Sequence, residues 1–364
     1  MLNWLEINLD AIAHNVREIK KTIGGKTDLI AIVKANAYGH GLIEVSKTAI
    51  KAGAKWLGVF NLEEGLKLRQ AGIKAPILCL GLVEKENIKS AILNDLSLVL
   101  YDLDFAKELA KFGAKVHLKI DTGMHRLGIK PENAVKFVEK VKKLGIKIEG
   151  VFSHFAESTD KKYSSFQLNK FKQTLLNLKE VGINPKIVHM SNSVGALTIK
   201  DARFNLVRCG IAMYGLSNAL KNRKPALSFR TKIIQVKNVK KGDYIGYKMT
   251  YKMPYDGKIA VLGAGYSDGY DRGLSNKGEV LIKGMRCFVI GLVCMNQTII
   301  DISKLSDPTS PRLREARIGD IATLIGEDGG DRITVEEIAK KLRTIPHEVV
   351  SRIPENVKRV YYGK

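Results

Sequence analysis

Residues 116–154 read VHLKIDTGMHRLGIKPENAVKFVEKVKKLGIKIEGVFSH, which is one complete strand–helix–strand pattern. Both ends are short aliphatic or β-branched runs, and the segment between them carries apolar residues at helical spacing. Pro131 opens that segment and Gly145 closes it, at the positions that helices prefer for these two residues. The stretch therefore predicts two strands joined by a helix.

The same alternation extends over more than two hundred residues on both sides of this unit. Strand-like runs begin at Leu29, Trp56, Ile77, Ser97, Val116, Ile148, Ile187 and Leu206. Longer segments with helical spacing separate them. Eight strands alternating with helices predict a (β/α)8 barrel of the TIM type, which we expect over residues 9–228, with catalytic groups at the C-terminal ends of the strands.

A different pattern begins at about Ser228. Short strands with close turns follow one another there, as in GEVLIKGMRCFVIGLVCMNQTIIDIS, residues 278–303. This pattern is typical of a mainly β domain, which we expect over residues 229–364. We also expect residues 1–8 to form a strand that packs with this second domain. The predicted fold class is α/β, a barrel followed by a β-rich C-terminal domain.

The composition is that of a globular protein: 364 residues, of which 45% are hydrophobic and 27% charged. No run approaches the roughly 18 to 20 apolar residues of a membrane helix, and the N-terminus carries acids where a signal peptide carries bases. The four cysteines have neither metal-ligand spacing nor the density of a disulfide scaffold. We therefore expect a cytoplasmic protein with no membrane segment and no metal site.

The net charge of +23, from 60 Lys and Arg against 37 Asp and Glu, raises the question of nucleic-acid binding. The lysines are scattered over amphipathic segments such as AVKFVEKVKKLGIKIEG, and no aromatic-rich or arginine-rich stripe accompanies them. They are better interpreted as solvated helix faces. We expect no nucleic-acid partner.

Chemically active side chains occur at the predicted strand ends. These are Lys34, Lys119 with Asp121, His154, Ser191 to Ser193, and Arg208. A lysine at such a position can be an ion-pair partner, a phosphate ligand or a covalent nucleophile, and Lys34 alone does not decide between them. The amides of Gly210 and Ile211 follow the last strand, where barrels commonly bind phosphate. A phosphorylated aldehyde cofactor would suit Lys34 at one end and this loop at the other.

Eight motifs carry a resemblance that covers nearly the whole chain. In order they are AIVKANAYGHG, HLKIDTGMHRLGI, SHFA, HMSNSVGAL, LVRCGIAMYGL, GYKMTY, GYSDGYDRG and CMNQ. In these motifs the chain resembles the alanine racemases. The resemblance implies a pyridoxal 5′-phosphate enzyme that interconverts L- and D-alanine and supplies D-alanine for peptidoglycan. It also implies a homodimer with composite active sites.

The resemblance further implies a role for each matching residue. Lys34 would hold the cofactor covalently and act as one of two acid/base groups, and Tyr247, reaching the partner subunit's barrel, would be the other. Cofactor contacts are implied for Lys34, Tyr38, Arg126, His154, Ser193, Arg208, Gly210 and Ile211. Among these, Arg208 would face the pyridine nitrogen, where a fixed cation opposes ring protonation and so favours racemisation.

Other matching residues would serve the substrate or support the catalytic groups. Arg126 would bind the substrate carboxylate, for which a planar guanidinium is suited. Substrate entrance residues would be Met295 and Tyr266 from the partner subunit. Supporting positions would be Lys119, His154, His189, Tyr266 and Asn296. The family lysine at position 119 is often carbamylated, whereas an ordinary ion pair with Asp121 is equally compatible with the sequence.

Two departures from the family pattern leave alternatives open. Asn296 stands where the family normally has aspartate, which changes the charge at the entrance, so a broader racemase for serine or lysine is an alternative. The tail SRIPENVKRVYY lacks a tyrosine near Glu355 that would contact the phosphate. An amino-acid decarboxylase of the same architecture is less favoured, because it would place a carboxylate, not Arg208, at the pyridine nitrogen. A non-catalytic cofactor-carrying barrel would lack the second domain.

Overall fold

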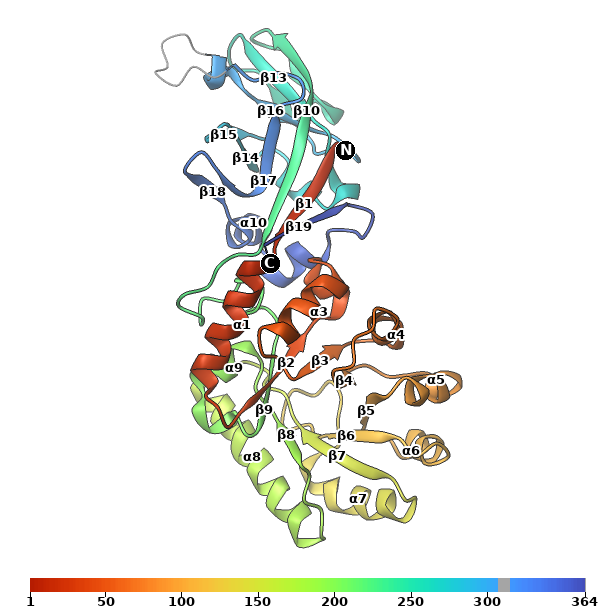
Figure 1. The fold of residues 1–364 in the computed structure, drawn as a ribbon. Coiled ribbons are helices and arrows are strands. Elements are labelled where there is room, and N and C mark those ends of the chain that lie inside the picture. The colour runs from red at the N-terminus through yellow and green to blue at the C-terminus, as the bar shows by residue number, and fades with distance from the viewer. Residues whose placement is uncertain (307–314, 364) are drawn as a thin grey trace. The chain divides into compact units, whose positions relative to one another are not determined.

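The computed structural model describes residues 1–306 and 315–363 (Figure 1). Its contacts divide the chain into two compact units. The barrel unit is Asp10–Pro225, and the β unit combines Met1–Leu9 with Ala226–Lys364. A closed barrel in one unit and a mainly β architecture in the other confirm the predicted fold class.

The barrel unit contains eight parallel strands, and the last strand pairs with the first to close the ring. The strands are β2 (Asp28–Ile32), β3 (Trp56–Val59), β4 (Ile77–Cys79), β5 (Leu96–Leu100), β6 (Lys115–Lys119), β7 (Lys147–Phe152), β8 (Ile187–His189) and β9 (Leu206–Cys209). Because all eight run in the same direction, their C-terminal ends meet at one rim, where barrel enzymes carry their chemistry.

Helix α1 precedes the first barrel strand, the other helices alternate with the strands, and labelled helices such as α4 to α8 lie outside the ring (Figure 1). They are α1 (Leu9–Ile23), α2 (Lys34–Tyr38), α3 (Leu42–Lys51), α4 (Leu62–Gln70), α5 (Ile88–Leu93), α6 (Leu103–Ala110), α7 (Ala134–Lys143), α8 (Lys161–Glu180) and α9 (Ser193–Thr198). Helix α7 buries Ala134, Phe137, Val138 and Val141, which lie on one face at helical spacing. Strand β5 is buried along its whole length, as expected for a parallel strand covered on both faces.

The β unit is organised around the long strand β10 (Leu227–Val239), which pairs antiparallel with three other strands. The others are β1 (Asn3–Asn8), β11 (Tyr244–Ile245), β12 (Tyr251–Lys252), β13 (Gly257–Leu262), β14 (Glu279–Ile282), β15 (Met285–Phe288), β16 (Thr298–Asp301), β17 (Ile321–Asp328), β18 (Asp331–Ile333) and β19 (Arg359–Tyr362). Two helices, α10 (Val335–Leu342) and α11 (Pro346–Ser351), complete it. Strand β1 lies between β10 and β19, so the first residues of the chain belong to this sheet.

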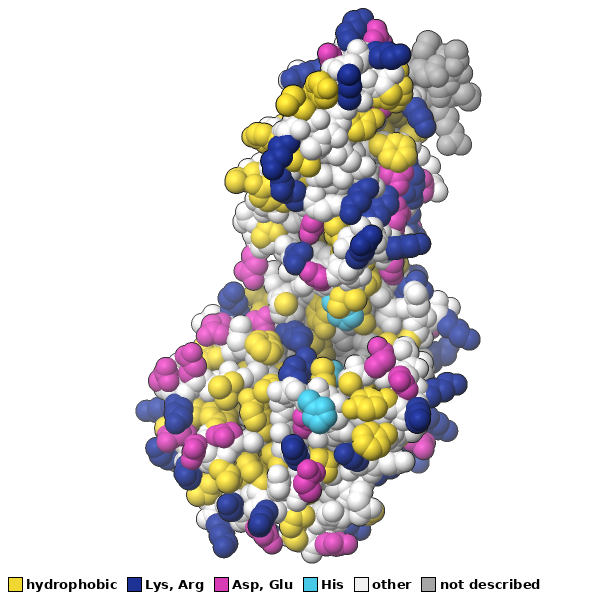
Figure 2. Space-filling model, turned by 180° about the vertical axis from the view of Figure 1, so that it is seen from behind, with side chains coloured by type: hydrophobic (Ala, Val, Ile, Leu, Met, Phe, Trp, Pro, Cys, Tyr) yellow, Lys and Arg dark blue, Asp and Glu magenta, His cyan; other side chains and the backbone are white. Residues whose placement is uncertain are grey.

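Basic and acidic side chains are interspersed on the surface. Figure 2 shows lysine and arginine scattered among acidic and apolar side chains on the face it displays, without a continuous basic stripe. Within residues 1–306 and 315–363, no helix has the length and apolarity needed to cross a membrane.

Candidate active site

Lys34 is the first residue of α2, just beyond the C-terminal end of β2. The four residues that follow it, Ala35 to Tyr38, all have positive φ angles between 51° and 53°. A left-handed backbone costs a non-glycine residue roughly 1 to 2 kcal/mol. Such strain persists only where the surroundings enforce it, and it gathers at functional sites.

Hydrogen bonds from outside the turn hold it in this conformation. The Glu64 carboxylate accepts from the amide of Asn36 at 3.3 Å and from that of Phe60 at 2.9 Å. The side chain of Asn36 in turn accepts from the amide of Leu42 at 2.8 Å. The position of Lys34 is therefore defined by contacts with the neighbouring helices α3 and α4.

The environment of the Lys34 amine favours its neutral form. Burial lowers the pKa of Lys34 from its usual value, the charge of Arg126 lowers it further, and Glu64 acts in the opposite direction. Only a neutral amine can attack an aldehyde carbon. A lowered pKa makes the neutral amine easier to form, which is the direction that a covalent nucleophile requires.

Tyr38, at the end of the same turn, lies beside the loop after β9. A Cβ atom on Gly210 would be 2.5 Å from the Tyr38 hydroxyl, so only glycine fits there. Ser193 Oγ accepts from the amides of Gly210 at 3.1 Å and Ala212 at 3.3 Å, whereas no hydrogen bond joins the Ile211 amide to another described residue. Burial raises the pKa of Tyr38 to about 12, so its hydroxyl stays protonated. These groups form a donor-rich loop suited to phosphate.

Arg208 is a buried cation whose orientation is fixed on several sides. Its Nη2 atom donates to the carbonyls of Ser153 at 2.7 Å and Met190 at 2.8 Å. Nη2 also lies 2.9 Å from Nδ1 of His154, and Nη1 donates to Nδ1 of His189. Burial lowers the pKa of Arg208 to about 9, which leaves the guanidinium charged at neutral pH.

The Phe152 ring contacts both Arg208 and Lys119. The Arg208 guanidinium carbon is 5.2 Å and the Lys119 amine 4.3 Å from the ring centroid, both within cation–π range. The His189 ring stacks on the same phenyl ring at 4.7 Å. Burial, followed by the charges of Arg208 and Arg126, lowers the pKa of Lys119 well below its usual value.

Asp121 organises the loop that leads to Arg126. Its Oδ1 atom accepts from the amides of Gly123, Met124 and His125, each at 3.0 Å. No ion pair joins Lys119 and Asp121 in the part of the chain that the structure describes. The simple Lys–Asp pair, one of the two alternatives left open by the sequence, is therefore not formed.

The pKa of His154 is affected by several basic side chains at the barrel rim. Burial lowers its pKa well below the usual value, and the charges of Arg208, Lys119, Arg126 and Lys34 lower it further, in that order. Two guanidinium groups and two lysine amines thus lie near one imidazole. A site of this kind is suited to anionic groups, such as a phosphate and a carboxylate.

Two buried histidines, His117 and His189, and the half-buried His154 make folding stability sensitive to mild acid. Burial is the largest cause that lowers the pKa of His117, His154 and His189. The unfolded chain regains the ordinary value near 6.5, so below that pH it binds more protons than the folded chain. Their contribution to stability is present above about pH 6.5 and is lost as pH falls, by up to about 1.4 kcal/mol per pH unit for each histidine.

Urea unfolding of the cofactor-free chain at about pH 7.5 and about pH 5.5, above the ordinary carboxylate range, measures this loss. The free energy of unfolding should be smaller at the lower pH, and His117→Gln should reduce the difference. Equal values at the two pH values would contradict the assignment of neutral, buried imidazoles.

The other predicted residues lie in the β unit and are exposed. The exposed fractions are 70% for Tyr247, 57% for Met295 and 42% for Tyr266. The Asn296 amide donates to Ser267 Oγ at 2.7 Å, and this hydroxyl donates to the Met295 carbonyl at 2.8 Å. Tyr266, Met295 and Asn296 therefore lie on adjoining loops.

The C-terminal tail makes a local structural contact at the position considered for the phosphate. The carbonyl of Glu355 accepts from the Arg359 side chain at 3.0 Å.

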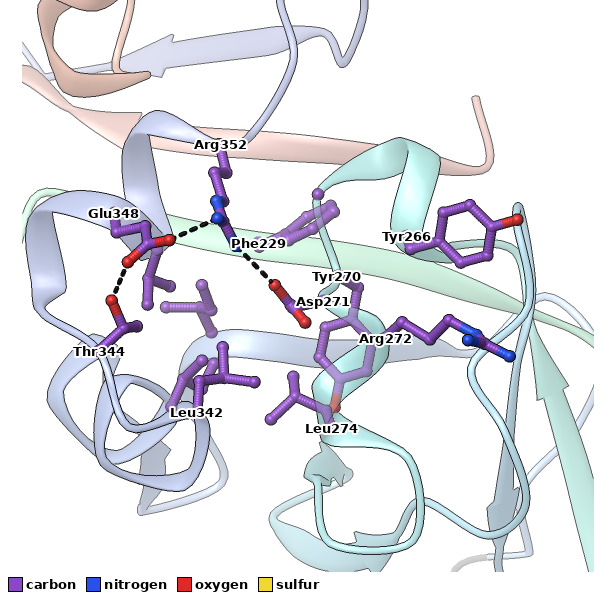
Figure 3. A pocket seen from close by; sticks show the side chains of 14 residues that line it. Phe229, Tyr266, Tyr270, Asp271, Arg272, Leu274, Leu342, Thr344, Glu348 and Arg352 are labelled. Atoms are coloured by element: carbon purple, nitrogen blue, oxygen red, sulfur yellow. Dashed lines mark hydrogen bonds and ion pairs between the residues drawn. The ribbon is translucent and has the colours of Figure 1, made fainter. Parts of the chain in front are cut away.

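A cavity of about 350 Å³ lies within the β unit and is lined mainly by apolar side chains such as Leu342 (Figure 3). Arg352 pairs with both Asp271 and Glu348 at its edge. The guanidinium of Arg272 points away from the apolar lining (Figure 3). The cavity lacks the converging cations of the barrel rim, so the rim is the better candidate site.

Sequence reasoning missed Phe152, His117 and Glu64. Phe152 lies two residues before His154, and His117 lies two before Lys119. Because alternate residues of a strand share a face, this spacing could have identified both. No local signal connects Glu64, in α4, with the turn after Lys34.

Comparisons with known proteins find matches along nearly the whole length of this chain. The family model "Alanine racemase, N-terminal domain" matches residues 7–218, and "Alanine racemase, C-terminal domain" matches residues 226–361. The chain is 40% identical to "Alanine racemase 2" of Caldanaerobacter subterraneus subsp. tengcongensis, with 98% of this chain and 94% of that protein covered. It is 39% identical to "Alanine racemase" of Methanococcus maripaludis, with 98% of each covered.

A solved structure is similar along the full length of the chain. The crystal structure of alanine racemase from Bacillus anthracis with bound L-Ala-P has a TM-score of 0.92 and 38% sequence identity. The comparison covers 99% of this chain and 95% of that chain.

Proposed function

Because the chain belongs to the alanine racemase family, whose members depend on pyridoxal phosphate, we propose that Lys34 holds this cofactor and that Tyr247 of a second copy completes the site. Its reaction is the racemisation of alanine, and the product D-alanine is a peptidoglycan precursor. The cytoplasmic location remains a prediction from the sequence.

The residues of the barrel rim fit the cofactor's chemical groups. Tyr38, Ser193 and the Ile211 amide would hold the phosphate, because a protonated hydroxyl, a fixed serine and an unpaired amide suit an anion. Lys34 would hold the aldehyde carbon, and Arg208 would face the ring nitrogen. When bound, pyridoxal phosphate supplies the electron sink that makes the α-proton of alanine removable.

The single observation that carries this proposal is that Lys34 and Arg208 lie at the C-terminal ends of the paired strands β2 and β9, at a rim that also holds the charge of Arg126. A phosphate and a substrate carboxylate would balance these charges. Arg126 is the residue proposed for the carboxylate. The backbone of the loop that leads to it is fixed by hydrogen bonds to Asp121.

A second copy would supply the other acid/base group. Tyr247, Met295 and Tyr266 are exposed aromatic or thioether side chains, which suits them for contact with another chain. Nδ1 of His154 lies 2.9 Å from the Arg208 guanidinium, which has only donors, and this favours the tautomer with the proton on Nε2. That N–H group would donate to the phenolic oxygen of Tyr247.

Chiral chromatography after incubation of the cofactor-loaded protein with L-alanine, L-serine and L-lysine separately tests the function. We expect D-alanine to form fastest. Asn296→Asp restores the charge that is usual in the family, so it would measure how far the neutral amide widens substrate choice. Absence of racemisation of all three amino acids by a folded, cofactor-loaded protein would contradict the proposal.

Arg208→Glu is expected to shift the reaction from racemisation toward transamination. A carboxylate at the ring nitrogen favours protonation of the ring, and one pKa unit there corresponds to about a tenfold change. The ratio of pyridoxamine phosphate formed to alanine racemised should therefore rise by at least about tenfold. Arg208→Lys keeps the cation and serves as the control, and equal ratios in both variants would mean that residue 208 does not face that nitrogen.

A further inference from the structure

A line of buried hydrogen bonds leads away from Arg208 through two histidines. Arg208 Nη1 donates to Nδ1 of His189, and Nε2 of His189 is 2.9 Å from Nδ1 of His117. Nε2 of His117 is 3.4 Å from Oε2 of Glu149. This last nitrogen is buried and forms no hydrogen bond within the described residues, so its approach to Glu149 is an electrostatic contact. The line thus has a cation at one end and a carboxylate at the other.

The groups at the two ends determine which ring nitrogen of each histidine carries its proton. A guanidinium can only donate, so Nδ1 of His189 must accept and its proton must be on Nε2. That N–H group donates to Nδ1 of His117, which places the His117 proton on Nε2, facing Glu149. The neutral imidazoles indicated by their lowered pKa values are compatible with this arrangement. An acceptor at position 149 is the group that completes it.

The strands are built to bring these side chains together. The pairing of β6 with β7 shifts between Val116 and His117, so that His117 pairs with Gly150 and Glu149 is an extra, bulged residue. Bulges redirect a side chain from its regular position. A Cβ atom on Gly150 would be 2.6 Å from Nδ1 of His117, so glycine is required for the imidazole of β6 to reach His189 on β8.

A hydrogen bond from Ser97 fixes the position of the Glu149 carboxylate. Ser97 Oγ donates to the same Oε2 atom at 2.8 Å. The contact with His117 is the largest cause that lowers the pKa of Glu149, and Lys115 acts in the same direction. Its side chain is 24% exposed, so the carboxylate retains some contact with water while its Oε2 atom faces the buried histidine.

We propose that Glu149 and His117 are positioning residues for Arg208, because together they hold His189 in the tautomer that accepts from the guanidinium. The expected effect on catalysis rests on the proposed function, in which Arg208 faces the ring nitrogen of the cofactor. Neither residue needs to touch cofactor or substrate. Without an acceptor at position 149, His117 would move its proton to Nδ1, where it would oppose the N–H of His189. The conflict would then be relieved at the bond between His189 and Arg208.

Nitrogen-15 NMR of the histidine side chains in the cofactor-free protein tests the tautomers directly. In the parent, His117 and His189 should both carry their proton on Nε2. Glu149→Ala should change the ring nitrogen signals of both histidines. Glu149→Gln should preserve them, because Ser97 donates to the position that the amide oxygen would take, and this oxygen would still face Nε2 of His117. Gly150→Ala, which displaces the His117 ring but keeps Glu149, should also change the His189 signals.

Glu108→Ala is the matched control. Glu108 forms an exposed ion pair with Lys111 in α6, and its loss should leave the histidine signals unchanged. In the loaded enzyme, Glu149→Ala should lower kcat by about tenfold, the lower end of what lost outer-shell partners cost. It should also raise the ratio of transamination to racemisation, and Glu149→Gln should restore both.

The outcomes separate this inference from a purely structural role and from the proposed function. If Glu149→Ala lowers the melting temperature but leaves the His189 signals and the reaction ratio unchanged, Glu149 only stabilises the fold and the proposal is wrong. Nδ1-protonated His189 in the parent would also overturn it. Failure of the loaded parent to racemise alanine would contradict the proposed function, whereas the tautomers of the cofactor-free chain would still decide the arrangement of the histidines.

Discussion

Lys34→Ala is expected to abolish racemisation in both directions and to release the cofactor on dialysis. The amine would be both the covalent anchor and one acid/base group, and acid/base assistance alone is worth roughly 10²- to 10⁴-fold. Activity should therefore fall by more than about 10⁴-fold. The visible absorbance of the bound cofactor after dialysis, and its fixation by borohydride, are the measurements.

Lys47→Ala provides the matched control for this experiment. Lys47 lies on α3, half-exposed and paired with Glu44, so its loss should affect neither the cofactor nor the rate. If Lys34→Ala kept the cofactor absorbance through dialysis and borohydride treatment, another lysine would be the anchor.

Tyr247→Phe is expected to lower racemisation by roughly 10²- to 10⁴-fold, because it deletes the second acid/base group. The fall must be equal in both directions, since a catalyst cannot move the equilibrium between enantiomers. Tyr247 is 70% exposed, so loss of its hydroxyl should leave the stability of the chain nearly unchanged. Tyr244→Phe, at an exposed tyrosine nearby in the sequence, is the control.

The loss should be specific to one face of the substrate, and hydrogen exchange can reveal it. In deuterium oxide, Tyr247→Phe should still exchange the α-proton of D-alanine with retention, through Lys34, while exchange from L-alanine nearly stops. The reason is geometric: a proton lost from one face must be regained from the other, and Lys34 is confined to one side. Similar exchange rates for both enantiomers would mean that a single group serves both faces.

The fold could be predicted because its signals are local and repeated. Eight aliphatic runs, each followed by a helical pattern such as the one that begins after Pro131, leave few architectures other than a barrel. The change to short strands after Ser228 predicted the β unit for the same reason. The structure confirms the fold class in both parts.

The candidate site was only partly predictable. The motifs identified Lys34, Arg208 and Tyr247. They did not predict the left-handed turn after Lys34, because none of the four residues in that turn is a glycine. Its stabilisation by Glu64 joins residues that are distant in the sequence. The bulge at Glu149 likewise depends on how two strands pair, which no single segment of sequence specifies.

The central claim, a site completed by a second chain, is tested most directly by mixing two inactive variants. Lys34→Ala and Tyr247→Phe subunits, unfolded or dissociated together and reassembled with cofactor, would form mixed dimers in which one site has both its Lys34 and the partner's Tyr247. Random pairing makes half of the dimers mixed, so activity should recover to about one quarter of the parent value. If the mixture, shown to contain mixed dimers, remains as inactive as its components, Lys34 and Tyr247 of different chains do not form one site and the account is contradicted.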